Sequence, residues 1–193
     1  LYGARRVPSP HADARPPGVE VSLIVIHGVS LPPGEFGGPW IEAFFSGRLD
    51  RRAHPYFACM ASLQVAPHLY VSRDGALIQF VSCERRAWHA GRSAWRGREE
   101  CNDFSIGIEL EGTDDIPYTG VQYARLTAVI VALRTHYTAV GEQDLAGHSD
   151  IAPGRKTDPG PAFDWARLAR DLAQAGYNFR REPIKNSGGG AET

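Results

Sequence analysis

Three residues of the chain have side chains of the types that can bind zinc. His27 ends a short apolar run rich in β-branched residues, His148 follows a glycine, and Asp158 precedes a Pro-Gly pair. Two imidazoles and one carboxylate are the ligand set of a catalytic zinc that keeps one position open for water. Isolated polar residues near turns are the competing interpretation, because the chain has no His-Glu-x-x-His motif and these spacings are not diagnostic.

A zinc hydrolase also needs a base for water and a cation for the developing oxyanion. Residues 104–111 alternate strictly, so Gly107, Glu109 and Glu111 share the polar face of a predicted strand. Glu109 is the better candidate base, since Glu111 is nearer the strand end; a solvated strand face is the alternative. Lys156 precedes the candidate aspartate ligand by two residues and would project with it from an extended loop, unless it is an ordinary surface lysine.

Other classes of protein are less well supported. No Gly-x-Ser-x-Gly motif is present, and Cys101 has no evident base, which disfavours nucleophilic serine or cysteine chemistry. The 193 residues carry a net charge of −1, so nothing favours nucleic acid or an anionic membrane. The apolar run around residues 23–26 is far shorter than the roughly 20 residues of a membrane helix.

The three cysteines form no Cys-x-x-Cys pair, which indicates a reducing compartment. The chain opens without a positively charged segment followed by an apolar one, the pattern of a secretory signal. We therefore expect a cytoplasmic protein.

The elements that must position these residues can be predicted from periodicity and turn signals. Residues 1–20 read as an extended arm, and residues 31–38, rich in Pro and Gly, as a loop. Strands are predicted at 21–26, which should be buried on both faces, and at 104–111, and two more at 69–72 and 77–81 should form a hairpin. Helices are predicted at 40–45 and 164–175. A third helix should begin after the Thr-x-x-Gln capping box at 119–122 and end near residue 141.

This pattern predicts an α+β fold in one loop-rich domain, with a mixed central β-sheet flanked by α-helices. We expect the domain to span residues 1–176, followed by a tail at 177–193 that is disordered at its end.

Four stretches of the chain, in the same order along the sequence, resemble the zinc-dependent N-acetylmuramoyl-L-alanine amidases, a family that includes peptidoglycan recognition proteins. They are residues 30–40, 87–91, 101–112 and 147–165. The Pro-Pro-Gly-Glu-Phe-Gly-Gly loop and the Cys-Asn-Asp-Phe strand resemble most specifically the branch that hydrolyses anhydro-N-acetylmuramoyl-L-alanine during cell-wall recycling. The resemblance runs from about Gly3 to Leu172.

The resemblance implies roles for the same residues that their chemistry had singled out. His27, His148 and Asp158 would hold Zn²⁺, and Glu109 and Lys156 would be catalytic. Trp88, in the Ala-Trp-His-Ala-Gly segment, would line the sugar site; further substrate contacts are expected from Gly28, Leu110 and Arg98. The expected substrate is a small muropeptide, and the expected state is a monomer without nucleic-acid or membrane partners.

Three positions depart from the family pattern. Gly28 stands where many relatives have Asn, while Glu100 and Gln64 stand where Arg is common. Arginines there would suit carboxylates of the stem peptide, so their loss affects how that peptide is gripped and leaves the zinc site untouched. Two alternatives stay open: an amidase acting on intact peptidoglycan, and a non-catalytic recognition module, which typically lacks part of the ligand set.

Overall fold

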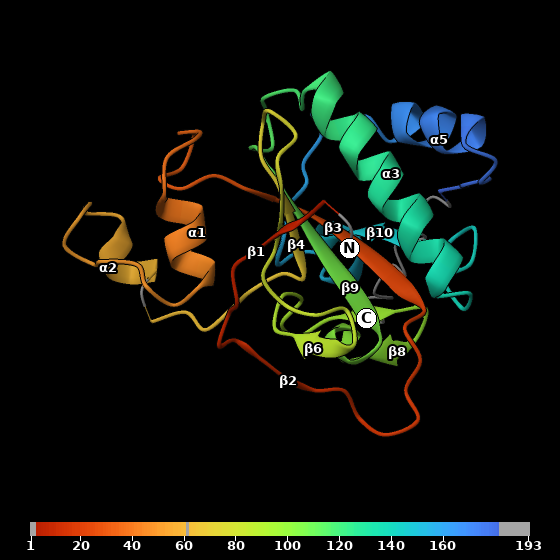
Figure 1. Cartoon of the computed structure of the whole chain (residues 1–193), viewed down its shortest axis with the longest axis horizontal. Helices are drawn as coiled ribbons and strands as arrows, with labels where there is room; N and C mark the ends of the chain where they lie inside the picture. Colours follow the sequence, from red (N-terminus) through yellow and green to blue (C-terminus); the bar gives the residue numbers. More distant parts are fainter. Residues whose placement is uncertain (1–2, 61, 182–193) are drawn as a thin grey trace, which may run out of the picture.

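The computed structural model describes residues 3–60 and 62–181. At its centre is a six-stranded sheet in the order β1-β5-β4-β9-β3-β10 (Figure 1). Only the β4–β5 pair is antiparallel, and the other four pairings are parallel. The strands are β1 (Arg5–Arg6), β3 (Leu23–Val29), β4 (Leu69–Val71), β5 (Leu77–Gln79), β9 (Ser105–Glu111) and β10 (Leu145–Gly147).

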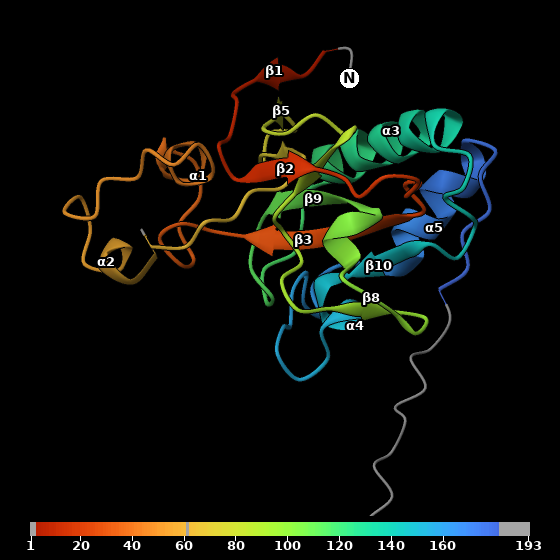
Figure 2. The same ribbon diagram turned by 90° about the horizontal axis from the view of Figure 1, so that it is seen from below.

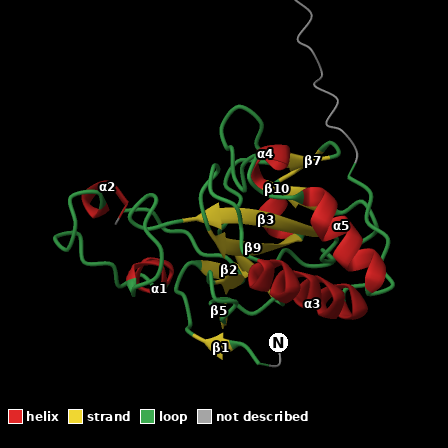
Figure 3. Ribbon diagram, turned by 90° about the horizontal axis from the view of Figure 1, so that it is seen from above, coloured by secondary structure: helices red, strands yellow, loops and turns green. Residues whose placement is uncertain are grey.

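Two helices, α3 (Gly120–His136) and α5 (Trp165–Gln174), cover one face of the sheet (Figure 3). The alternating residues Ile106, Ile108 and Leu110 of β9 point toward them into the largest apolar cluster. Burial of such a face against amphipathic helices is the main driving force for this layer arrangement. The polar alternate residues of β9 therefore face the opposite side of the sheet.

Shorter elements and loops cover that second face. Two small antiparallel pairs lie there, β2 (Ala12–Ala14) with β6 (Arg85–Ala87) and β7 (Ala94–Trp95) with β8 (Arg98–Glu99), beside a 3₁₀ helix and α4 (His148–Ile151). Helices α1 (Trp40–Phe45) and α2 (Phe57–Met60) form an extension at one side (Figures 1 and 2). A second apolar cluster joins α1 to the outer strands.

The predicted α+β fold with a mixed sheet and flanking helices is confirmed. The strand predicted at 21–26 is β3, which runs from residue 23 to residue 29. It lies inside the sheet between β9 and β10, in keeping with the expected burial of both its faces. The capping box of Thr119 and Gln122 is present, although α3 ends at His136 rather than near residue 141. Strands β4 and β5 match the predicted hairpin. The other strands of two or three residues and the four-residue helices α2 and α4 escaped prediction, because so few residues display no period.

The N-terminal arm does more than wrap the domain, since it contributes β1 and β2 to two sheets. Its Arg15 guanidinium donates hydrogen bonds to the carbonyls of Cys83, Asn102, Asp103 and Ser105. At the other end, Phe179 is buried in the helix-side core and Arg181 pairs with Asp150 at 2.7 Å. The packed domain thus continues past the expected boundary at 176; residues 182–193 lie outside the described part.

Candidate zinc site and active site

The candidate catalytic residues lie in one row across the sheet. The parallel register pairs His27 of β3 with Glu109 of β9, and Glu109 with Tyr70 of β4. His148 extends this row, because it directly follows Gly147, which pairs with the residue before His27. Paired residues of neighbouring strands point to the same face, so these side chains share the face away from α3 and α5.

Asp158 joins the row from the loop that follows α4. Its Oδ2 atom lies 3.1 Å from Nδ1 of His148 and 3.4 Å from Nδ1 of His27, and the two Nδ1 atoms are 3.0 Å apart. Four ligands placed about 2.0–2.1 Å from a tetrahedral zinc stand roughly 3.3 Å from one another. The three atoms therefore form one face of a zinc-sized site, and they are the ligand set that a catalytic zinc prefers.

The surroundings keep these groups in their ligating forms. Burial, with the neighbouring His148, lowers the pKa of His27 to about 4, so the imidazole stays neutral at pH 7. Burial works against ionisation of Asp158, but its close contacts with His148 and His27 hold its pKa far below the ordinary value. A neutral imidazole at His27 and an ionised carboxylate at Asp158 are the protonation states in which these groups bind a metal.

Glu109 has the environment of a general base. Its Oε2 atom is buried and has no hydrogen-bond partner among the described residues. Burial, and then the charge of Asp158, raise the pKa of Glu109 well above its ordinary value, while the charge of Lys156 opposes the rise. A raised pKa brings a carboxylate closer to neutral pH, where it can both take up and return a proton. Lys156 itself is exposed on the same loop as Asp158.

The expected substrate-binding residues lie in different surroundings. The ring centroid of Trp88 is 6.2 Å from that of His11, and its neighbour His89 is the residue that reaches the zinc site. The Arg98 guanidinium stacks on the Phe104 ring, with its Cζ atom 3.9 Å from the ring centroid. The side chain of Leu110 is fully buried in the helix-side core, so only its main chain remains for a substrate contact.

Gly28 is packed against a residue that the sequence analysis did not single out. A Cβ atom at this position would lie 2.3 Å from the hydroxyl of Tyr118, which donates a 3.0 Å hydrogen bond to the carbonyl of Pro159. The main-chain nitrogen of Gly28 in turn lies 3.4 Å from Oδ2 of Asp158. The absence of a side chain at Gly28 thus lets Tyr118 hold the loop that carries the aspartate.

Glu111 has a different task from Glu109. Its buried carboxylate accepts hydrogen bonds from the main-chain nitrogens of Gly37 and Arg73. It therefore ties the Pro- and Gly-rich loop to the β4–β5 turn. The two other departures from the family pattern lie on the surface, since both Gln64 and Glu100 are exposed.

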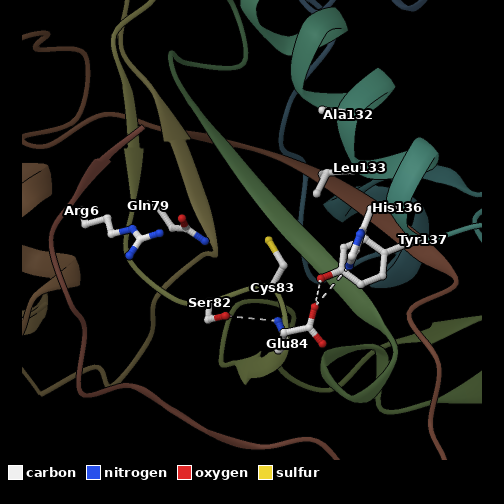
Figure 4. A pocket seen from close by; sticks show the side chains of 9 residues that line it. All are labelled: Arg6, Gln79, Ser82, Cys83, Glu84, Ala132, Leu133, His136 and Tyr137. Carbon is white, nitrogen blue, oxygen red and sulfur yellow. Dashed lines mark hydrogen bonds and ion pairs between the residues drawn. The ribbon is translucent and has the colours of Figure 1, made fainter. Parts of the chain in front are cut away.

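A separate cavity of about 340 Å³ lies between the β5 side of the sheet and α3 (Figure 4). Glu84 at its edge accepts a 2.6 Å hydrogen bond from the Tyr137 hydroxyl and lies 3.6 Å from His136. Its lining includes none of the candidate ligands or catalytic residues, so it is distinct from the zinc site.

Among the described residues, no helix is both long and apolar enough to cross a bilayer.

Comparisons with known proteins identify the family of this chain. Residues 17–161 match the N-acetylmuramoyl-L-alanine amidase family. The chain is 60% identical over 168 residues to the 1,6-anhydro-N-acetylmuramyl-L-alanine amidase AmpD of Citrobacter freundii, covering 87% of this chain and 89% of that protein. The corresponding protein of Haemophilus influenzae is 46% identical, with 86% and 91% covered.

Solved structures show the same relationship. A crystal structure of a selenomethionine AmpD derivative superposes with a TM-score of 0.87 at 58% identity, covering 89% of this chain and 96% of that one. The Escherichia coli amidase AmiD, solved with anhydro-N-acetylmuramic acid-L-Ala-D-γ-Glu-L-Lys, has a TM-score of 0.58 at 27% identity, with 85% and 61% covered. The chain belongs to the N-acetylmuramoyl-L-alanine amidase family.

Proposed function

We propose that this protein is a zinc-dependent amidase that hydrolyses the amide between anhydro-N-acetylmuramic acid and L-alanine in muropeptides of peptidoglycan recycling. The observation that carries the proposal is the convergence of His27, His148 and Asp158 beside Glu109. Relatives 46–60% identical over most of the chain are named for this activity.

The donor set suits zinc, and His27, His148 and Asp158 would hold it. When bound, zinc supplies Lewis acidity, which makes water nucleophilic near neutral pH and polarises a carbonyl. Glu109 takes the proton of the attacking water and returns it to the departing alanine nitrogen. Lys156 contributes positive charge near the oxygen on which negative charge develops.

We propose that substrate contacts come from Trp88, Arg98 and the main chain of Gly28 and Leu110. The protein would act as a monomer. We also propose a cytoplasmic location, in keeping with three unpaired cysteines, Cys59, Cys83 and Cys101.

The decisive assay follows peptide release by mass spectrometry from anhydromuramoyl-tripeptide and, in parallel, from intact sacculi. Release from the small substrate alone, lost on chelation and restored by Zn²⁺, is the expected result. Comparable release from sacculi would instead favour an amidase of intact peptidoglycan. No release from either by zinc-loaded protein would contradict the proposal and favour a recognition module.

A further inference from the structure

The dipeptide His89–Ala90 contacts both candidate zinc histidines at their Nε2 atoms. Nδ1 of His89 lies 2.9 Å from Nε2 of His27, and the carbonyl oxygen of Ala90 lies 3.1 Å from Nε2 of His148. In each ligand Nε2 is thus hydrogen-bonded, while Nδ1 faces the other ligands. One short segment therefore touches both imidazoles.

The direction of each hydrogen bond near His27 follows from a main-chain carbonyl at the end of the chain of contacts. The carbonyl of Cys101 can only accept, so it receives the hydroxyl proton of Ser105. The Ser105 oxygen then accepts from Nε2 of His89 at 3.1 Å. With its proton on Nε2, neutral His89 has a free lone pair on Nδ1, which accepts from Nε2–H of His27. The Nδ1 lone pair of His27 is thereby left for the metal.

The same reasoning applies to His148 in a single step. The carbonyl of Ala90 is an acceptor only, so Nε2 of His148 must carry the proton that it donates. Nδ1 of His148 is then the unprotonated nitrogen, beside Oδ2 of Asp158. Both imidazoles are consequently held in the tautomer that binds metal through Nδ1.

The His89–Ala90 segment is itself held in place by hydrogen bonds and packing. The Asn102 side-chain oxygen accepts hydrogen bonds from the main-chain nitrogens of His89 and Ala90, at 3.0 and 2.8 Å. Arg155 donates to the Ala90 carbonyl at 2.7 Å. The His89 ring lies over Gly107, where a Cβ atom would stand 2.4 Å from its Nδ1. Gly107 therefore leaves the space that the ring fills.

We propose that His89 is a positioning residue of the zinc site, which together with the Ala90 carbonyl selects Nδ1 as the metal-binding nitrogen of both histidine ligands. This inference rests on the proposed zinc dependence of the enzyme. Hydrogen-bonding partners of metal-ligating histidines typically contribute a factor of about 10 to 100 in metal affinity. Loss of the acceptor at His89 should weaken zinc binding by that factor.

The test measures zinc affinity by competition with a chromogenic chelator in the full chain. His89→Leu removes the acceptor, and we expect its zinc Kd to rise by about 10- to 100-fold. His89→Gln offers an amide oxygen in its place and should recover part of the affinity. Ser105→Ala leaves His89 in position but removes the group that orients its proton, and should weaken binding in the same direction. His136→Gln, at an exposed histidine, is the matched control with unchanged Kd.

A second readout uses long-range ¹H–¹⁵N NMR of the zinc-loaded wild type, in which His27 and His148 should each show a protonated Nε2 and a metal-bound Nδ1. Coordination through Nε2 in the wild type would overturn the inference. Wild-type affinity in both His89→Leu and Ser105→Ala would also overturn it. If His89→Leu fails to fold, as judged by circular dichroism, Ser105→Ala alone decides. If zinc affinity depends on His89 as expected but the zinc-loaded protein hydrolyses no amide, the proposed function is contradicted and this inference stands.

Discussion

Acid should destabilise the metal-free protein through its buried histidines, and His68 offers the cleanest measurement. This side chain is fully buried, its Nδ1 accepts a 3.0 Å hydrogen bond from Gly107, and it lies beside the Arg15 guanidinium. Burial, and then the charge of Arg15, lower the pKa of His68 to about 3. The folded protein thus keeps His68 neutral at a pH where the unfolded chain protonates it.

The magnitude follows from proton linkage. With a pKa of about 6.5 in the unfolded chain, protonation at pH 5 stabilises that chain by roughly RT ln(1 + 10^1.5), or about 2 kcal/mol, against almost nothing at pH 7.5. Because the folded-state pKa is depressed for a base, stability is full above about pH 6.5 and falls as the pH drops toward 3. One buried histidine therefore accounts for a substantial part of a typical stability of about 5–15 kcal/mol.

The assay compares urea unfolding of the wild type and His68→Gln at pH 7.5 and pH 5, both with chelator present. Glutamine can still accept from Gly107 and donate to the Arg85 carbonyl, but it does not titrate. We expect the wild type to lose about 2 kcal/mol more than the variant between the two pH values. Glu109, whose raised pKa acts in the opposite direction, is common to both proteins and cancels.

An identical pH dependence in the two proteins would refute this reasoning, whatever their absolute stabilities. The matched control is His136→Gln, because His136 is exposed and contacts Glu84 at the surface. That variant should keep the pH dependence of the wild type.

Four further predictions concern catalysis, metal and packing. Glu109→Gln and Lys156→Ala should each keep zinc but lose about 10²- to 10³-fold in turnover of anhydromuramoyl-tripeptide, and near-normal turnover would contradict the assigned role. Chelation should lower the melting temperature, since ligand at about 1,000 times its Kd stabilises a fold by roughly 4 kcal/mol; an unchanged melting curve would argue against a structural coupling of metal and fold. Gly28→Ala should cost about 1–3 kcal/mol in urea unfolding because its Cβ meets the Tyr118 hydroxyl, and less in a Tyr118→Phe background; equal costs in both backgrounds would exclude that clash as the cause. Asp164→Ala should cost about 1 kcal/mol, because the side chain caps α5 at the Arg167 nitrogen, whereas Asp164→Asn should cost less.

Much of this protein could be predicted from its sequence because the relevant signals are local. Strict alternation marked β9, and the Thr-x-x-Gln pattern marked the start of α3. Residue chemistry and motif resemblance together singled out His27, His148 and Asp158, whose ligand atoms the structure brings within 4.8 Å of one another. Their metal-binding role remains a prediction until zinc is measured.

The tertiary structure decided which neighbours these residues have. Only the parallel register of β3 and β9 places Glu109 beside His27. Alternation had already assigned Leu110 to the apolar face, yet its proposed substrate contact has to be limited to the main chain, because that face packs against α3 and α5. Tyr118 carried no sequence signal, since its importance arises from the space left by Gly28.

The sequence by itself therefore determined the residue types of the site and the strands and helices that carry them, because helical and strand periods and caps are properties of adjacent residues. It did not determine the tautomers of His27 and His148. The tautomer of His27 depends on His89, Ser105 and the Cys101 carbonyl, which come from separate segments of the chain. The hydrogen bond that Ser105 donates to Cys101 orients His89, and His89 in turn fixes which nitrogen of His27 is unprotonated. Such long-range contacts form only when the chain has folded, and they leave no period in the sequence.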